Sequence, residues 1–182
     1  MMLTALQTRK LNRAFTLFDV DRNGFMEGSD CELVVSATTQ AMGYTVGSPE
    51  YTAYYNEYMA GWQALLQLGD SDGDQKLTAA EFCTAYDKMM ANREQFGVVI
   101  MGVIKTIVTL WDSNKDGKVS QPEYHAYMTA FHATDAEAAE AFRQLDRNRD
   151  GYLTTDELLK NAEEFFLSDD PAAPGNWLVG PY

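Results

Sequence analysis

The sequence predicts an all-α fold in which four helix–loop–helix units pack as two pairs in one compact globule. Three observations predict it. Four twelve-residue windows share one acidic template, apolar helical patterns flank these windows, and helix-capping signals follow them. The windows, called loops one to four here, are 19–30, 70–81, 112–123 and 146–157. With 182 residues, of which 46% are hydrophobic, the chain is long enough to bury a substantial core.

The four loops agree position by position. They read DVDRNGFMEGSD, DSDGDQKLTAAE, DSNKDGKVSQPE and DRNRDGYLTTDE. Positions one, three, five and twelve carry oxygen-bearing side chains in every loop. Position six is glycine except for Gln75 in loop two. Position eight is apolar, which predicts a short antiparallel bridge between paired loops, through Met26, Leu77, Val119 and Leu153.

This spacing is what a calcium ion requires. Calcium takes six to eight oxygen ligands, and a loop can supply them from side chains at positions one, three, five and twelve and from a backbone carbonyl at position seven. A single such window could be an ordinary acidic turn, but four windows between helical patterns favour cation sites. The predicted metal ligands are Asp19, Asp21, Asn23, Phe25 and Asp30 in loop one; Asp70, Asp72, Asp74, Lys76 and Glu81 in loop two; Asp112, Asn114, Asp116, Lys118 and Glu123 in loop three; and Asp146, Asn148, Asp150, Tyr152 and Glu157 in loop four.

Loops one and two depart from the template. Gln75 must take a positive φ at a cost of roughly 1–2 kcal/mol, which would weaken ion binding by about ten-fold. An additional carboxylate and Gly73 offset that cost, so we expect loop two to bind; the alternative is an acidic loop that stays empty. In loop one, Asp30 is shorter than glutamate and is expected to give one oxygen rather than two, which suits six-coordinate magnesium. We therefore expect three or four Ca²⁺ ions, with Mg²⁺ competing in loop one.

Helices are expected on both sides of each loop. The apolar residues Leu3, Leu6, Leu11, Phe15 and Phe18 predict the first helix. The turn-rich segment 42–50 links loops one and two, and Pro49 suits the first turn of a helix. Helix starts are predicted from capping pairs, which are Ser29 with Glu32, Thr78 with Glu81, Asn92 with Gln95, Ser120 with Glu123, Thr134 with Glu137, and Thr154 with Glu157.

The most apolar segment is 96–111, which carries one charge, Lys105. A helix with few polar faces is expected to be buried, here joining the two halves of the core; the alternative is a helix that lines a partner-binding groove. The expected organisation is an N-terminal pair in 1–91, a C-terminal pair in 92–168 and a tail in 169–182. The tail contains Trp177, Leu178 and Val179 and could fold back into the interior or stay disordered.

Composition excludes several functions. The net charge of −13 argues against nucleic acid and against an anionic membrane surface as partners. The N-terminal residues show no signal peptide, and segment 96–111 is too short to span a bilayer. Cys31 and Cys83 do not form a disulfide framework and are expected to be small buried residues, with a redox role as the alternative. A cytoplasmic location is expected. The sequence has no nucleophile–base pattern or phosphate loop, so an enzyme is not predicted.

The loops DxDxNG, DxNxDG and DxNxDG between helices resemble EF-hands. Four of them, unevenly spaced in 182 residues, with Glu27 at position nine and Asp30 at position twelve of loop one, resemble the calerythrin and sarcoplasmic calcium-binding protein family. The resemblance implies a compact helical fold and intracellular binding and buffering of calcium, often with magnesium. The second loop of such proteins is often degenerate, whereas loop two here keeps all four acids.

This resemblance predicts a monomer that buffers or transports calcium. Nine methionines leave open a calcium sensor that exposes an apolar groove and regulates a protein partner. Calcium-triggered photoproteins share the fold and hold a luciferin. This chain has many aromatic residues but only two histidines, His125 and His132, so that enzymatic alternative is the least favoured.

Overall fold

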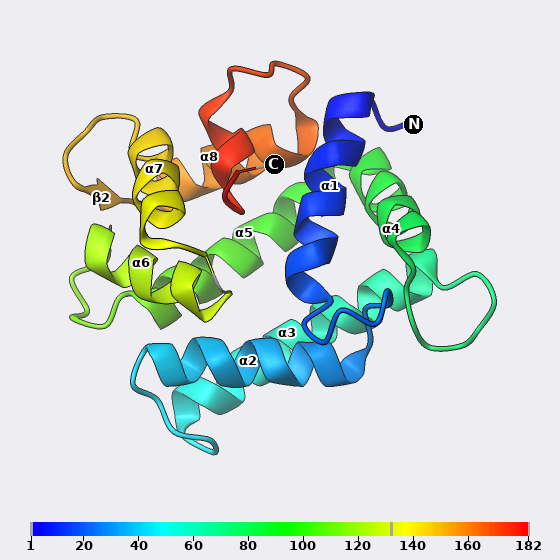
Figure 1. The fold of residues 1–182 in the computed structure, drawn as a ribbon, viewed down its shortest axis with the longest axis horizontal. Coiled ribbons are helices and arrows are strands. Elements are labelled where there is room, and N and C mark those ends of the chain that lie inside the picture. Colours follow the sequence, from blue (N-terminus) through cyan, green and yellow to red (C-terminus); the bar gives the residue numbers. More distant parts are fainter. Residues whose placement is uncertain (1, 132, 182) are drawn as a thin grey trace.

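The protein is described by a computed structural model that covers residues 2–131 and 133–181, without the side chains of residues 95 and 130. His132 therefore lies outside the described residues, as does the side chain of the predicted cap Gln95. Figure 1 shows helices that cross around a common centre, with the loops at the periphery. In chain order the elements are α1 (Ala5–Phe18), α2 (Gly28–Ala41), α3 (Pro49–Gly69), α4 (Ala79–Ala91), α5 (Arg93–Trp111), β1 (Val119–Ser120), α6 (Gln121–Ala130), α7 (Asp135–Leu145), β2 (Tyr152–Leu153), α8 (Thr155–Leu167) and the 3₁₀ helix η1 (Pro174–Trp177).

The loops pair as predicted. Met26 and Leu77 form an antiparallel bridge between loops one and two, with N–H···O distances of 2.8 and 2.9 Å. Val119 pairs with Leu153 between loops three and four, within the two-stranded sheet of β1 and β2. All four side chains at position eight are buried, so each bridge anchors its loop pair to the core.

Most helices begin at the predicted caps. Capping boxes open α4, α6, α7 and α8, and Pro49 occupies the first turn of α3 behind a Ser48 cap. The predicted box of Ser29 with Glu32 is wrong. In the structure Glu27 and Asp30 form the box that opens α2, because the exiting helix starts at the same position of loop one as of the other loops.

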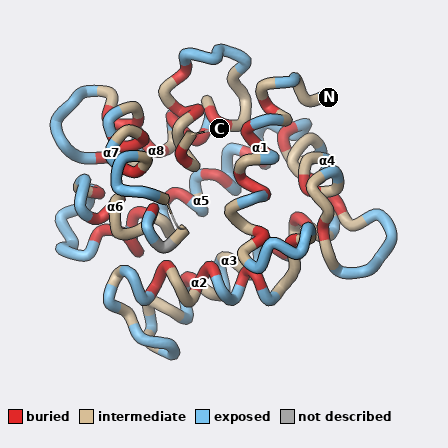
Figure 2. Tube along the Cα trace, in the orientation of Figure 1, coloured by how far each residue is buried: buried red, intermediate tan, exposed pale blue. Residues whose placement is uncertain are grey.

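The core consists of two groups of buried side chains that half-buried residues connect. One gathers around Trp111, Tyr124 and Phe142 in the C-terminal half, and the other around Trp62 and Phe82 in the N-terminal half. Half-buried side chains pack against both groups, and these are Leu3, Tyr58, Tyr86, Met89, Phe166 and Leu178. Figure 2 shows buried positions along the inward sides of the helices from both halves.

Helix α5 joins the two halves, since it contacts α3 and α4 on one side and α6 and α8 on the other. The expectation that it is buried is wrong for one of its faces, because Val98 is 70% exposed and Val99, Met101 and Val103 are 37–38% exposed. Its inner face, from Phe96 to Trp111, is buried. Among the described residues, no single helix is long and apolar enough to cross a membrane. Helices α4 and α5 pass that test only together, as a pair bent by 112°.

The C-terminal tail folds back onto the molecule. After α8 it turns into η1, which packs against α7 and α8 (Figure 1). Trp177 contacts the C-terminal group of the core, Val179 the N-terminal group, and Leu178 both. The prediction that the tail folds back is confirmed, but Trp177, Leu178 and Val179 are only half-buried and pack against the core from its edge.

The two cysteines are free and differ in burial. Cys31 is buried at the start of α2, and burial raises the pKa of its thiol to about 12, which keeps it protonated and unreactive. Cys83 is only half-buried in α4, and its thiol lies 3.7 Å from Asn12 Oδ1. Full burial is therefore confirmed for Cys31 alone.

Candidate calcium sites

The carboxylate at position one organises each loop. Asp19, Asp70, Asp112 and Asp146 each follow directly after the entering helix. Each accepts a hydrogen bond from the position-six amide of its own loop, at 3.0, 3.1, 2.7 and 2.9 Å. This bond closes the turn, so the amide of Gln75 does what the glycine amide does in the other loops.

Positions three and five repeat one hydrogen-bonding pattern in all four loops. The amide at position five donates to the position-three side chain, at 2.8–3.2 Å. The amide at position seven donates to the position-five side chain, at 2.8–3.0 Å. These bonds turn the side-chain oxygens toward the inside of the loop, where an ion would lie.

The position-twelve side chain comes from the first turn of the exiting helix. Glu81 and Glu123 each accept bonds from the residue at position nine and from the amide and hydroxyl of a serine at position two, Ser71 or Ser113. These bonds lower the pKa of Glu81 to about 2, with the Ser71 hydroxyl as the largest cause. The glutamates are thus held ionised and oriented before an ion is bound.

Loop four lacks the serine. Its position two is Arg147, whose side chain turns away toward Asn161 and Glu164. One oxygen of Glu157, Oε2, is held by Thr154, while Oε1 is buried with no hydrogen-bond partner among the described residues. A bound cation would satisfy that oxygen.

Loop two has moved its glycine rather than lost it. Gln75 has φ +63°, as expected for position six. Position four is also left-handed in every loop, with Arg22, Lys115 and Arg149 at φ 58–62° and Gly73 at φ +79°. Each loop therefore contains one glycine and one other residue at positive φ. The sequence analysis did not predict a left-handed residue at position four. Three of the four residues there are Arg or Lys, which do not indicate a positive φ.

In loop one the position-twelve residue, Asp30, is buried. Asp30 is 1% exposed, and burial raises its pKa against the effect of the amides of Glu27, Asp21 and Val20. Its carboxylate oxygens, with those of Asp19 and Asp21, include three ligand atoms that all lie within 4.8 Å of one another. These carboxylates are close enough together to share one cation, and the predicted preference of this loop for magnesium stays a prediction.

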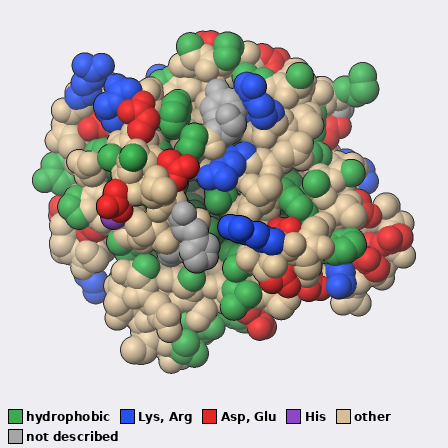
Figure 3. Space-filling view, viewed as in Figure 1, with side chains coloured by type: hydrophobic (Ala, Val, Ile, Leu, Met, Phe, Trp, Pro, Cys, Tyr) green, Lys and Arg blue, Asp and Glu red, His purple; other side chains and the backbone are tan. Residues whose placement is uncertain are grey.

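Loop two is the loop in which none of the predicted ligands is buried. Asp70, Asp72 and Asp74 also offer three oxygens within 4.8 Å of one another. Residues 71–75 are all exposed, and Figure 3 shows acidic side chains gathered at the edge of the molecule where this loop projects. Four unneutralised carboxylates in one exposed loop repel each other and favour cation binding.

Lysines at position seven connect the loops of each pair, which sequence reasoning did not predict. Lys76 of loop two lies 2.9 Å from Glu27 of loop one, and its ammonium group lies 5.5 Å from the centre of the Phe25 ring. The hydrogen bond from Lys76 is the largest cause of the lowered pKa of Glu27. In the other pair, Lys118 lies 5.0 Å from the centre of the Tyr152 ring. Both pairs thus place a cation over the aromatic ring of the partner loop.

The donor set fits calcium and magnesium. The predicted ligands lie together in four separate loops, and they offer carboxylate, amide and carbonyl oxygens with neither thiolate nor imidazole. Hard divalent cations prefer such oxygens, whereas zinc and copper favour sulfur or imidazole.

Comparison with known proteins agrees with this geometry. The EF-hand domain model matches residues 137–165, which contain loop four. Calerythrin of Saccharopolyspora erythraea is 31% identical over 166 residues, 90% of this chain and 94% of its own length. The alpha chain of the sarcoplasmic calcium-binding protein of Penaeus vannamei is 28% identical over 91% of this chain and 90% of its own length. The luciferin-binding protein of Renilla reniformis is 26% identical over 97% of this chain and 94% of its own length.

Solved structures share the fold. One is a calcium-binding protein of Streptomyces coelicolor, whose structure is described as the structural basis for prokaryotic calcium-mediated regulation. It superposes with a TM-score of 0.77 at 27% identity and covers 90% of this chain and 99% of its own. The sarcoplasmic calcium-binding protein of amphioxus gives 0.76 at 17% identity, over the full length of both chains. The four loops, their pairing and the 31% identity to calerythrin along nine tenths of the sequence lead to one conclusion: the chain belongs to the calerythrin and sarcoplasmic calcium-binding protein family of EF-hand proteins.

Proposed function

We propose that this protein buffers or transports calcium as a cytoplasmic monomer and is not an enzyme. One observation supports the buffer most directly. Trp177, Leu178 and Val179 of the tail already pack against both groups of the core. A sensor must expose an apolar groove when it fills, but here the chain's own tail covers the surface between the halves.

The test is the binding of an apolar fluorescent dye during a calcium titration at fixed millimolar magnesium. For a buffer we expect dye fluorescence to be highest without calcium and to fall as the sites fill and the core tightens. A rise on adding calcium would mean that filling opens a groove, and would overturn the buffer in favour of a sensor.

We propose that four calcium ions bind, including one in loop two, because that loop makes the same closing hydrogen bond and has the same number of strained residues as the others. Calorimetric titration should give four sites in the wild type and three in a Glu81→Gln variant. Equal stoichiometry in the two proteins would show that loop two is empty.

The second candidate is a calcium-dependent regulator of a protein partner. The exposed apolar face of α5, with Val98 and Met101, favours it, as does the 27% identical neighbour linked to calcium-mediated regulation. The dye titration separates this candidate from the buffer.

Binding of a luciferin-like aromatic ligand ranks third. It is favoured by the relative that binds luciferin and by two buried polar atoms without partners among the described residues, Trp111 Nε1 and the Tyr124 hydroxyl oxygen. Binding of Renilla luciferin, measured by quenching of tryptophan fluorescence, would support it. No quenching at micromolar ligand would exclude it.

A further inference from the structure

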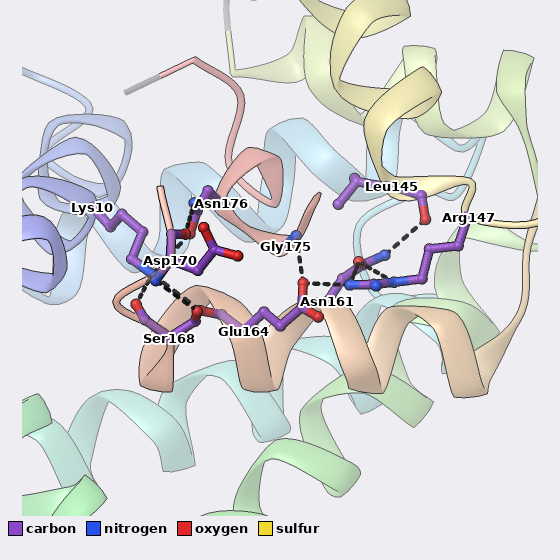
Figure 4. Close-up of polar contacts among 9 residues, drawn as sticks. All are labelled: Lys10, Leu145, Arg147, Asn161, Glu164, Ser168, Asp170, Gly175 and Asn176. Carbon is purple, nitrogen blue, oxygen red and sulfur yellow. Dashed lines mark hydrogen bonds and ion pairs between the residues drawn. The ribbon is translucent and has the colours of Figure 1, made fainter. Parts of the chain in front are cut away.

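A network of buried and half-buried polar groups runs from loop four to the C-terminal tail (Figure 4). At the loop end, Arg147 lies between the predicted ligands Asp146 and Asn148. Its guanidinium donates to Asn161 Oδ1 at 3.0 and 2.8 Å and forms an ion pair with Glu164. Both acceptors belong to α8, so the side chain fixes the loop to this helix.

The same residues of α8 hold the tail. Glu164 Oε2, which pairs with Arg147, also accepts the amide of Gly175 at 3.1 Å. Asn161 donates to Leu145 O at 2.9 Å, at the residue directly before loop four. One carboxylate oxygen thus contacts both the calcium loop and the tail.

Gly175 shows how closely the tail approaches. A Cβ atom at this position would lie 2.3 Å from the backbone oxygen of Asn161 and 2.6 Å from Glu164 Cβ. The next residue, Asn176, is fully buried and accepts a hydrogen bond from Lys10 Nζ at 3.0 Å. Any larger residue at position 175 must lift the tail from α8.

Loop four also leaves one oxygen of its position-twelve carboxylate without a hydrogen bond among the described residues. Among the described residues, Glu157 Oε1 is buried without a partner, whereas a position-two serine holds the corresponding oxygen in loops two and three and the Val20 amide holds it in loop one. Without a cation this oxygen carries a desolvation cost. Filling the loop removes the cost and fixes Asp146 and Asn148, and hence Arg147 between them.

We propose that the C-terminal tail is a latch whose docking is coupled to the ion in loop four through Arg147 and Glu164. The proposal rests on calcium binding by loop four. A filled loop holds Arg147 where it orients Glu164 toward the Gly175 amide, so the ion and the docked tail stabilise each other. Coupling is reciprocal, so undocking the tail must weaken calcium binding in this loop by the same factor.

The first experiment measures hydrogen exchange of the amides of residues 175–180 with and without calcium. Glu157→Gln disables loop four. Glu81→Gln is the matched control in loop two, where position two is Ser71, whose hydroxyl donates to Glu81 of its own loop. We expect calcium to slow exchange about five-fold or more in the wild type and the control, and to have little effect in Glu157→Gln. Equal protection in both variants would overturn the proposal.

The reciprocal experiment follows the Gly151 amide proton by NMR during a calcium titration. This amide donates to Asp146 at 2.9 Å and so reports on loop four alone. Glu164→Ala should raise the calcium midpoint about five-fold, whereas Glu163→Ala, an exposed neighbour with the same charge change, should not. Gly175→Ala should act like Glu164→Ala, with Gly61→Ala as its control, since a Cβ at residue 61 meets open space.

The outcomes separate this proposal from the proposed function. If wild-type Gly151 does not respond to calcium, loop four does not bind and the proposed function fails for that loop. If Gly151 responds but Glu164→Ala and Gly175→Ala leave its midpoint unchanged, calcium binds and the latch is refuted. Circular dichroism checks that each variant is folded, and the two variants act at different atoms, so either one is sufficient for the test.

Discussion

At the scale of single residues, the strain in the loops is distributed differently from what the position of the glycines suggests. Loop two places Gly73 at position four and Gln75 at position six, while the other loops place a long side chain at position four and glycine at position six. A left-handed non-glycine residue costs roughly 1–2 kcal/mol, and every loop contains one. The missing glycine is thus not a defect of loop two alone.

This balance predicts the effects of two substitutions in loop two. Gln75→Gly removes the strained residue and should tighten calcium binding there by a few-fold, about 1 kcal/mol. Gly73→Ala adds a second strained residue at φ +79° and should weaken binding by a similar factor. Calorimetric titration measures both. A loss of the site in Gln75→Gly would contradict the account.

The short acid of loop one predicts a change in ion selectivity. Asp30→Glu adds one methylene and allows a second oxygen to reach the ion, which favours calcium over six-coordinate magnesium. We expect the ratio of calcium to magnesium affinity in this loop to increase about ten-fold, measured by calcium titration at several magnesium concentrations. Unchanged affinities for both ions would refute the mixed-site hypothesis.

At the scale of elements, helix crossings depend on small residues at a few points. Helix α3 ends at Gly69, where a Cβ would lie 2.6 Å from Glu81 O and 2.9 Å from Ala85 Cβ in α4. Backbone atoms cannot move away as a flexible side chain can, so this glycine sets the closest approach of α3 and α4. Gly61, in the same helix, has no such neighbour.

The contrast predicts opposite effects on stability. Gly69→Ala should lower the free energy of unfolding by roughly 1–3 kcal/mol through overpacking. Gly61→Ala should raise it by up to about 1 kcal/mol, because alanine loses less backbone entropy in a helix. Chemical denaturation at fixed calcium measures both. Equal effects would show that the α3–α4 contact is looser than described.

At the scale of the whole molecule, the two ends of the chain meet at one buried cation. Lys10 of α1 is fully buried and donates at 3.0 Å to Glu164 O, Ser168 O and Asn176 Oδ1. Burial lowers the pKa of its ammonium group to about 8, against the attraction of Asp169 and Glu164. This residue joins α1, the end of α8 and the tail.

The lowered pKa predicts how stability depends on pH. Between about pH 8 and the ordinary pKa of 10.5, the unfolded chain keeps the Lys10 proton while the folded chain loses it. Stability from this group therefore rises with pH in that window, by up to about 1.4 kcal/mol per unit. The free energy of unfolding of the wild type relative to Lys10→Met should increase from pH 8 to 9.5 at saturating calcium. A decrease would mean that the three acceptors hold the pKa above its ordinary value.

The sequence by itself determined the four loops, their predicted ligands, the loop pairing and most helix starts. These features are local: the ligands of a loop lie within twelve residues, and a capping box joins residues three apart. The structure alone decided the exposed face of α5, the pairing of Lys76 with Glu27, the burial of Lys10 and the link from Arg147 to the tail. Lys10 meets its acceptors across 154 to 166 residues of sequence. An apolar pattern indicates that a face is buried, but not which distant polar groups meet there, because that depends on how all the helices pack together.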